Sequence, residues 1–208
     1  NYSVTSVTGT TANITAKTLS VTAAAVNKQY DANTNATVTF ADDRVSGDVL
    51  TVTGNASFVN KNVGVGKTVN VSGISISGTD SGNYTQNTTT STTADITSKT
   101  LTVSATAQNK VNDGNTGATV TLTNNAVAGD VVTQTFTSAN FDTASTGSGK
   151  VVTVLGVAIA GADATNYTLA SSTAVTTANI TNAPSSGGGS SRVIIIPVEP
   201  IVGKVLGA

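Results

Sequence analysis

The sequence repeats itself after about 82 residues, and this period limits the fold more than any other feature. Residues 17–19 and 99–101 are both Lys-Thr-Leu, and the Gly-Asp pair that ends at Asp48 returns at Asp130. Further along the offset grows by one residue. The chain therefore contains two copies of one structural unit, residues 17–98 and residues 99–182, with one residue inserted between residues 131 and 146 of the second copy.

The two ends of the chain fall outside these copies. Residues 12–15 (Ala-Asn-Ile-Thr) match the close of each unit at residues 94–97 and 178–181. We therefore interpret residues 1–16 as the C-terminal end of a preceding repeat. Residues 183–208 form a third kind of segment, a Gly/Ser linker followed by an apolar strand.

Alternating apolar and polar residues within each unit predict half-buried β-strands. Leu19, Val21 and Ala23 show this period of two. The alternation changes phase at Gly73 and again at Gly156, which predicts a β-bulge or a strand that crosses between sheets at each glycine. No stretch carries the spacing of an amphipathic helix, so the sequence predicts an all-β fold.

Short strands separated by turn signals, in units of this length, are typical of a sandwich of roughly seven strands. Tyr84 and Tyr167 stand where such sandwiches carry a corner tyrosine that is buried and bonded to nearby backbone. We expect tandem immunoglobulin-like β-sandwich repeats, with a β-grasp-like fold as the alternative.

The composition removes most catalytic chemistry. The chain has no Cys, Met, Trp or His, and its aromatic content is 4%. Without imidazole or thiolate there is no usual base, nucleophile or zinc site, so we expect no enzyme, no cofactor and no metal. Charged residues make up 10% of the chain and the net charge is −1, which argues against nucleic acid. The apolar runs are too short to span a membrane.

Two motifs invite a functional interpretation that we consider weaker than a structural one. Residues 64–67 (Gly-Val-Gly-Lys) resemble part of a phosphate loop, but a hairpin turn that ends in a solvated lysine fits them better. Four aspartates are candidate calcium ligands, but Asx turns, in which the carboxylate accepts backbone N–H bonds, explain all four better. These residues are Asp31, Asp80, Asp113 and Asp163.

The apolar C-terminal segment is a candidate assembly strand, because an exposed run of this kind readily pairs with another strand edge. Three partners are open: the second repeat of the same chain, a neighbouring copy, or secretion and anchoring machinery. Self-association is slightly favoured. The residues of this candidate strand are Val193, Ile194, Ile195, Ile196, Val198, Ile201 and Val202.

The repeat resembles the YDG domain, which is found in tandem in filamentous-haemagglutinin-like bacterial surface adhesins, and the related MBG-type repeats. The resemblance rests on residues 17–19, 30–32 (Tyr-Asp-Ala), 60–67, 82–85 and 94–97 and on their order. The first copy has Ala32 for the glycine of the family tripeptide, and the second copy has Asn112 for its tyrosine. Residues 141–144 also replace the Lys-Asn-Val-Gly segment, and such drift suits a structural repeat.

The resemblance implies a secreted or cell-surface location and an adhesin stalk. The leading hypothesis is accordingly a structural spacer, with assembly into filaments by strand addition. The alternative is an adhesive module whose Thr-rich strand faces bind host or surface glycans. The resemblance does not supply a ligand.

Overall fold

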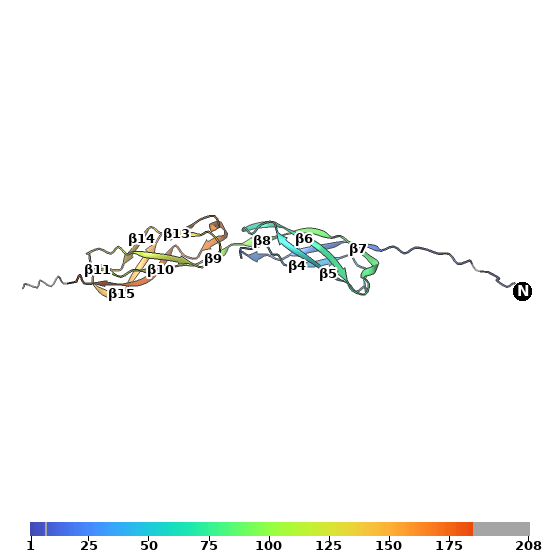
Figure 1. Cartoon of the computed structure of the whole chain (residues 1–208), viewed down its shortest axis with the longest axis horizontal. Coiled ribbons are helices and arrows are strands. Elements are labelled where there is room, and N and C mark those ends of the chain that lie inside the picture. Colours follow the sequence, from blue (N-terminus) through green and yellow to red (C-terminus); the bar gives the residue numbers. More distant parts are fainter. Residues whose placement is uncertain (7, 185–208) are drawn as a thin grey trace, which may run out of the picture.

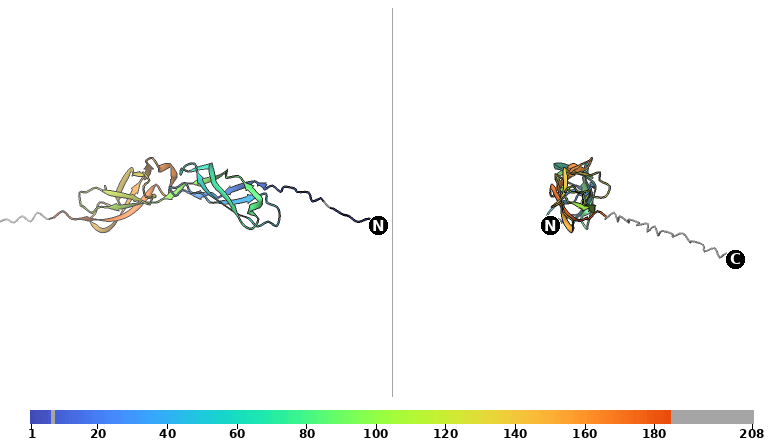
Figure 2. Two further views of the ribbon diagram at one scale, coloured as in Figure 1. Left: turned by 45° about the vertical axis from the view of Figure 1, so that its right-hand side comes forward. Right: turned by 90° about the vertical axis from the view of Figure 1, so that its left-hand side faces the viewer.

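The computed structural model describes residues 1–6 and 8–184. Two β-rich units follow one another along the longest axis of the molecule (Figure 1). Viewed along that axis, in the right panel of Figure 2, the two units overlap within one small outline. We call residues 17–98 repeat 1 and residues 99–182 repeat 2.

Both repeats consist of short strands and one 3-10 turn. Repeat 1 contains β1 (Lys17–Leu19), β2 (Val21–Ala25), β3 (Lys28–Gln29), β4 (Val38–Asp42), β5 (Thr51–Phe58), β6 (Gly64–Ser77), η1 (Ser81–Asn83), β7 (Tyr84–Gln86) and β8 (Thr89–Thr97). Repeat 2 contains β9 (Lys99–Leu101), β10 (Val103–Ala107), β11 (Lys110–Val111), β12 (Val120–Asn124), β13 (Thr133–Thr135), β14 (Ser138–Phe141), β15 (Gly147–Leu155), β16 (Ala158–Ala160), η2 (Ala164–Asn166), β17 (Tyr167–Leu169) and β18 (Thr173–Thr181).

The all-β prediction is confirmed, since helical structure in the described residues is limited to η1 and η2. Roughly seven strands per repeat were expected, and the described part of repeat 1 has eight strand segments and that of repeat 2 has ten. The first strand of each repeat is divided into three segments. Side chains interrupt it: the Ser20 N–H, for example, bonds to the Asp43 carboxylate at 2.7 Å.

Each repeat combines a four-stranded sheet with a two-stranded ribbon. The sheets have the orders β3-β8-β6-β5 and β11-β18-β15-β14, and the ribbons are β2-β4 and β10-β12. Neighbouring strands in the sheets are antiparallel except where β3 and β11 run parallel to the last strands, β8 and β18. A second parallel pair, β1 with β7 and β9 with β17, lies at the start of each repeat.

The ribbon packs on the sheet to form a small two-layered core. In repeat 1, Val21 of the ribbon lies in one apolar cluster with Val71 and Ile74 of the sheet, and all three are buried. Exposed and covered residues alternate along β4 and β8, as the period of two requires.

The inserted residue lies between β13 and β14. Thr53 pairs with Ser75 in repeat 1 as Thr135 pairs with Ala158 in repeat 2, but the next pairs downstream begin at Asn55 and Ser138. Gly54 is thus replaced by two residues, 136–137. This position falls within the predicted interval of residues 131–146.

The two phase-changing glycines interrupt their strands in different ways. Gly73 has a φ of 62° and lies within β6, beside a register shift against β5. Gly156 has a φ of 67° and separates β15 from β16, so the chain passes from the sheet to a pair with β13. The first is therefore a bulge and the second a crossing, which are the two outcomes predicted for such a phase change.

Residues 1–6 and 8–16 form no strand. Tyr2 and Ile14 are fully exposed, whereas the equivalent Tyr84 and Ile96 are buried in repeat 1. Their assignment to a preceding repeat stays a prediction. Across the described residues, no helix has the length and apolar character needed to cross a membrane.

Candidate functional site

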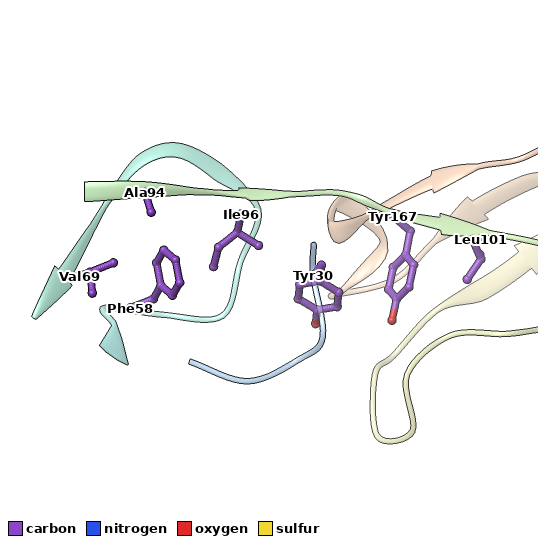
Figure 3. Close-up of a cluster of buried hydrophobic side chains, with 7 residues drawn as sticks. All are labelled: Tyr30, Phe58, Val69, Ala94, Ile96, Leu101 and Tyr167. Carbon is purple, nitrogen blue, oxygen red and sulfur yellow. The ribbon is translucent and has the colours of Figure 1, made fainter. Parts of the chain in front are cut away.

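A cluster of polar side chains joined by hydrogen bonds and ion pairs lies where repeat 1 meets repeat 2. Two tyrosine rings, Tyr30 of repeat 1 and Tyr167 of repeat 2, stand side by side there (Figure 3). Their centroids are 5.4 Å apart and their planes cross at 74°, which is an edge-to-face contact. Both rings are buried. We call this region the junction.

The carboxylate of Asp130 is the centre of the junction. It accepts hydrogen bonds from the Tyr30 hydroxyl at 2.8 Å and from the Tyr167 hydroxyl at 2.6 Å. Its other oxygen accepts a hydrogen bond from Lys61 Nζ at 2.8 Å. The side chain of Asp130 is only 2% exposed, so its charge depends on these three partners.

Lys61 connects the loop between β5 and β6 to two acidic side chains of repeat 2. Besides Asp130, its Nζ lies 3.0 Å from an Asp163 oxygen and 5.8 Å from the centre of the Tyr30 ring. One lysine thus bridges two carboxylates that would otherwise repel each other. These ion pairs join repeat 1 to repeat 2 at a second place, in addition to the chain connection through Ser98.

The environment sets the protonation of these groups. Burial favours the neutral acid, but the hydrogen bonds from Lys61, Tyr167 and Tyr30 outweigh it, so the pKa of Asp130 lies below its usual value. Hydrogen bonds to Asp130 and Asp163 raise the pKa of Lys61. Burial and the bond to Asp130 raise the pKa of Tyr167 to about 12 and also raise the pKa of Tyr30. At neutral pH the junction therefore holds one charged lysine, the two carboxylates of Asp130 and Asp163, and two neutral phenols.

Asn166 adds a second polar contact across the junction. Its side-chain oxygen accepts the backbone N–H of Val63 at 3.0 Å, and its amide group donates to Asn62 at 3.4 Å. Asn166 is 2% exposed and is, among the described residues, the one polar residue that is buried when backbone and side chain are counted together. Because Asn166 bonds to a backbone N–H, this contact fixes the position of the β5–β6 loop. It adds to the charged contacts that Lys61 of the same loop makes.

Apolar packing continues the core of repeat 1 into repeat 2. Tyr30, Phe58 and Ile96 share one cluster with Leu101 and Tyr167 of repeat 2. Figure 3 shows these side chains in a row along the strand that connects the repeats. The junction is thus an internal interface rather than a contact between two separate surfaces.

The corner-tyrosine prediction is confirmed for both repeats. Tyr84 and Tyr167 are buried, and their hydroxyls accept the backbone N–H of Val45 and Val127, each at 2.9 Å. The Tyr84 hydroxyl also donates to Asp48, as Tyr167 donates to Asp130. The prediction missed that Tyr167 has a further role, because its ring contacts the neighbouring repeat.

The Asx-turn interpretation is correct for two of the four aspartates. Asp31 and Asp113 accept the backbone N–H two residues ahead, each at 3.1 Å. It is wrong for Asp80 and Asp163, whose carboxylates reach across to the N–H of Val49 and Val131 at 2.8 and 2.9 Å. The described residues contain no group of three or more acidic, His or Cys side chains that could hold a metal.

The predicted hairpin turn at residues 64–67 is also wrong in position. The turn occupies residues 59–63, and residues 64–67 already belong to β6, with a register shift against β8. Lys67 is not freely solvated, because its Nζ donates to Asn60 at 2.7 Å. The lysine of this region that contacts repeat 2 is Lys61, which lies in the turn itself.

The candidate assembly strand at Val193, Ile194, Ile195, Ile196, Val198, Ile201 and Val202 lies outside the described residues. Its pairing partner therefore stays a prediction.

The two repeats differ at one end. The end of repeat 1 that enters the junction, which we call its tip, carries Tyr30 and Lys61. At the tip of repeat 2 these positions are Asn112 and Ala144. Both donors are therefore lost together, and this paired loss was the sequence signal that could have revealed the junction.

Comparison with known families supports the repeat. The model of the YDG domain matches residues 15–93 and again residues 97–181. These two matches cover most of the chain, so the chain belongs to the YDG domain family. No curated protein and no solved structure matches it, and the choice between immunoglobulin-like and β-grasp-like topology stays a prediction.

Proposed function

We propose that this chain is a structural spacer in the stalk of a secreted or cell-surface bacterial adhesin, of the filamentous-haemagglutinin-like kind. The observation that carries the proposal is the junction, which joins two YDG domains end to end along one axis (Figure 1). A stalk requires units that keep their direction when they are connected in series.

The junction supports stiffness because its contacts lie around the connection. β8 ends at Thr97 and β9 begins at Lys99, so Ser98 alone links the two strands. Such a short connection would still allow bending if nothing else held the repeats. The hydrogen bonds of Tyr30 and Lys61 to Asp130 add fixed points away from that link. Bending would break charged and buried contacts.

We further propose that the chain has no catalytic activity. The best-organised carboxylates, Asp130 and Asp163, are already bonded to tyrosine, lysine and backbone groups. A general acid or base needs a proton-transfer route to a substrate, and these bonds occupy that route.

Single-molecule imaging of the intact parent protein tests the spacer function. The expected result is a thin, extended particle whose length increases with the number of YDG domains. A compact particle in which the domains fold back on one another would contradict the proposal. Variants that lack the Tyr30 and Lys61 side chains serve as the control, and we expect them to show a more bent contour.

A second candidate function is glycan binding through hydroxyl-rich strand faces. A shallow hollow of about 560 Å³ on repeat 1 favours it, since its lining is mostly Asn, Ser and Thr. The lining residues are Asn70, Val71, Ser72, Thr89, Thr90 and Ser91. The hollow lacks an aromatic platform among these residues. A glycan array and a surface-adsorption assay with this chain test the candidate, and binding that survives Ser91→Ala, a change at an exposed lining residue, would count against this site.

A further inference from the structure

Repeat 1 has an end that corresponds to the half of the junction contributed by repeat 2. We call this end the base of a repeat. In repeat 2 the base comprises Asp130, Asp163, Asn166 and Tyr167, and it receives the tip of repeat 1. The same residue types stand at the base of repeat 1, as Asp48, Asp80, Asn83 and Tyr84.

The base of repeat 1 has the internal bonds of its filled counterpart. Val49 N–H donates to Asp80 at 2.8 Å, compared with 2.9 Å between Val131 and Asp163 in repeat 2. The corner tyrosine donates to the aspartate of the preceding loop in both repeats. These bonds fix the two carboxylates before any partner arrives, so the base is preorganised.

The base of repeat 1 still has acceptor capacity that repeat 2 has used. Asp130 receives three donors, two of them from repeat 1. Among the described residues, Asp48 receives a side-chain donor only from Tyr84. Asn83 is exposed, whereas its equivalent Asn166 is 2% exposed. The unused acceptors match a lysine, a phenol and a backbone N–H.

Apolar surface is also left uncovered at this base. Val45 is 54% exposed, whereas the equivalent Val127 packs against the cluster at the junction. The two bases differ in charge beside the corner loop, where Arg44 stands at the position of Ala126 in repeat 2. All three guanidinium nitrogens of Arg44 donate to Asp42 or to the Leu50 carbonyl. Its guanidinium hydrogen bonds therefore all go to groups other than Asp48.

The tip of repeat 2 has the same backbone arrangement as the tip of repeat 1 but lacks its tyrosine and lysine donors. Tyr30 N–H bonds to the Thr97 carbonyl, and Asn112 N–H bonds to the Thr181 carbonyl, each at 2.8 Å. The backbone thus places Asn112 as it places Tyr30. The asparagine side chain is too short to place a donor where the Tyr30 hydroxyl lies, and Ala144 in the equivalent loop has no charge to replace that of Lys61.

We propose that the base of repeat 1 is a docking site for the tip of another YDG domain that carries tyrosine and lysine at the positions of Tyr30 and Lys61. The tip of repeat 2 does not dock in this way, so the recognition has a direction. This inference does not depend on the spacer function, because it concerns only which end of a repeat binds another.

A three-repeat chain tests the inference. A second copy of residues 17–98 is inserted between residues 16 and 17 of the full chain, so that the tip of the copy faces the base of repeat 1. Because the sequence has no Cys, single spin labels can be attached at Thr22→Cys in the copy and in repeat 1. Labels at the equivalent exposed positions Thr22 and Ser104 of the original chain report the existing junction.

Electron-electron resonance then gives the distance distribution between the two labels. We expect the copy and repeat 1 to show the same mean distance and the same narrow width as the reference pair 22–104. In a matched chain whose copy carries Tyr30→Asn and Lys61→Ala, the residues found in repeat 2, we expect a clearly broader distribution.

Two results would overturn the inference. One is an equally narrow distribution for both copies, since the connecting residue alone would then set the orientation. The other is an equally broad distribution for both, since the base would then fail to bind a complete tip. A copy with Tyr30→Phe and Lys61→Ala keeps the aromatic ring but lacks both donors, so it separates the effect of the hydrogen bonds from that of the ring. Circular dichroism of each chain verifies that the added copy is folded.

Discussion

Replacing Asp130 by asparagine should destabilise the junction more than any other conservative change. Asparagine keeps the size of the side chain and an acceptor oxygen but removes the charge that Tyr30 and Tyr167 bond to at 2.8 and 2.6 Å. A hydrogen bond to a charged group contributes about 1.5–3 kcal/mol and a neutral one about 0.5–1.5 kcal/mol. Each tyrosine bond then loses roughly 1 kcal/mol, or roughly 2 kcal/mol for the pair.

Thermal unfolding measured by circular dichroism provides the assay. For a domain of this size, 1 kcal/mol corresponds to about 4–8 °C, so we expect the Asp130→Asn chain to melt at least about 8 °C lower. Lys61 retains Asp163 as a partner, which limits the additional loss. Chemical denaturation should show a lower midpoint at an unchanged slope.

The matched control is Asp48→Asn in repeat 1. Asp48 bonds to the corner tyrosine of its own repeat but, among the described residues, to no neighbouring repeat. We therefore expect a distinctly smaller fall in melting temperature. Equal losses for the two variants, or no loss for Asp130→Asn, would refute the claim that the junction contacts stabilise the chain.

Three further outcomes are expected. Gly156→Ala should lower the melting temperature of repeat 2 far more than Gly73→Ala lowers that of repeat 1. An added Cβ would lie 1.6 Å from a threonine hydroxyl at Gly156, but no closer than 3.7 Å to any neighbour at Gly73. Equal melting temperatures would contradict this expectation. Stability should be highest between about pH 4 and pH 10. Because the pKa of Asp130 is lowered, its contribution to stability is lost as the pH falls below the ordinary value of 3.8. Because the pKa of Tyr167 is raised, its contribution to stability is lost as the pH rises from 10.0 to about 12. A melting temperature that does not change with pH would contradict both. Deletion of residues 192–208 should convert any oligomer to a monomer in light scattering, and an unchanged monomer before and after deletion would exclude self-assembly through this segment.

The repeat and its corner tyrosines were predictable because local sequence carries them. The period of two along each strand and the recurrence of Tyr84 as Tyr167 need no knowledge of long-range contacts. The positions of Gly73 and Gly156 were predictable for the same reason. Sequence could not decide which glycine forms a bulge and which a crossing, since that depends on the strand that faces each one.

The junction was not predictable from any single motif. Tyr30 and Asp130 are 100 residues apart in sequence, and neither stands in a pattern that signals a partner. Asp163 appeared to be a local turn residue, because its distant bond to Val131 depends on the path of the chain. The loss of both Tyr30 and Lys61 in repeat 2 was visible, but only the fold places their equivalents at one end.

Residual dipolar couplings measured on the chain in a weakly aligning medium test the central claim most directly, because they report the orientation of each repeat separately. We expect the amide couplings of residues 17–98 and 99–182 to fit one common alignment tensor. The Tyr30→Asn, Lys61→Ala double variant should instead give two tensors of different magnitude. Two independent tensors in the unmodified chain would contradict the account, because repeats 1 and 2 would then reorient freely about Ser98.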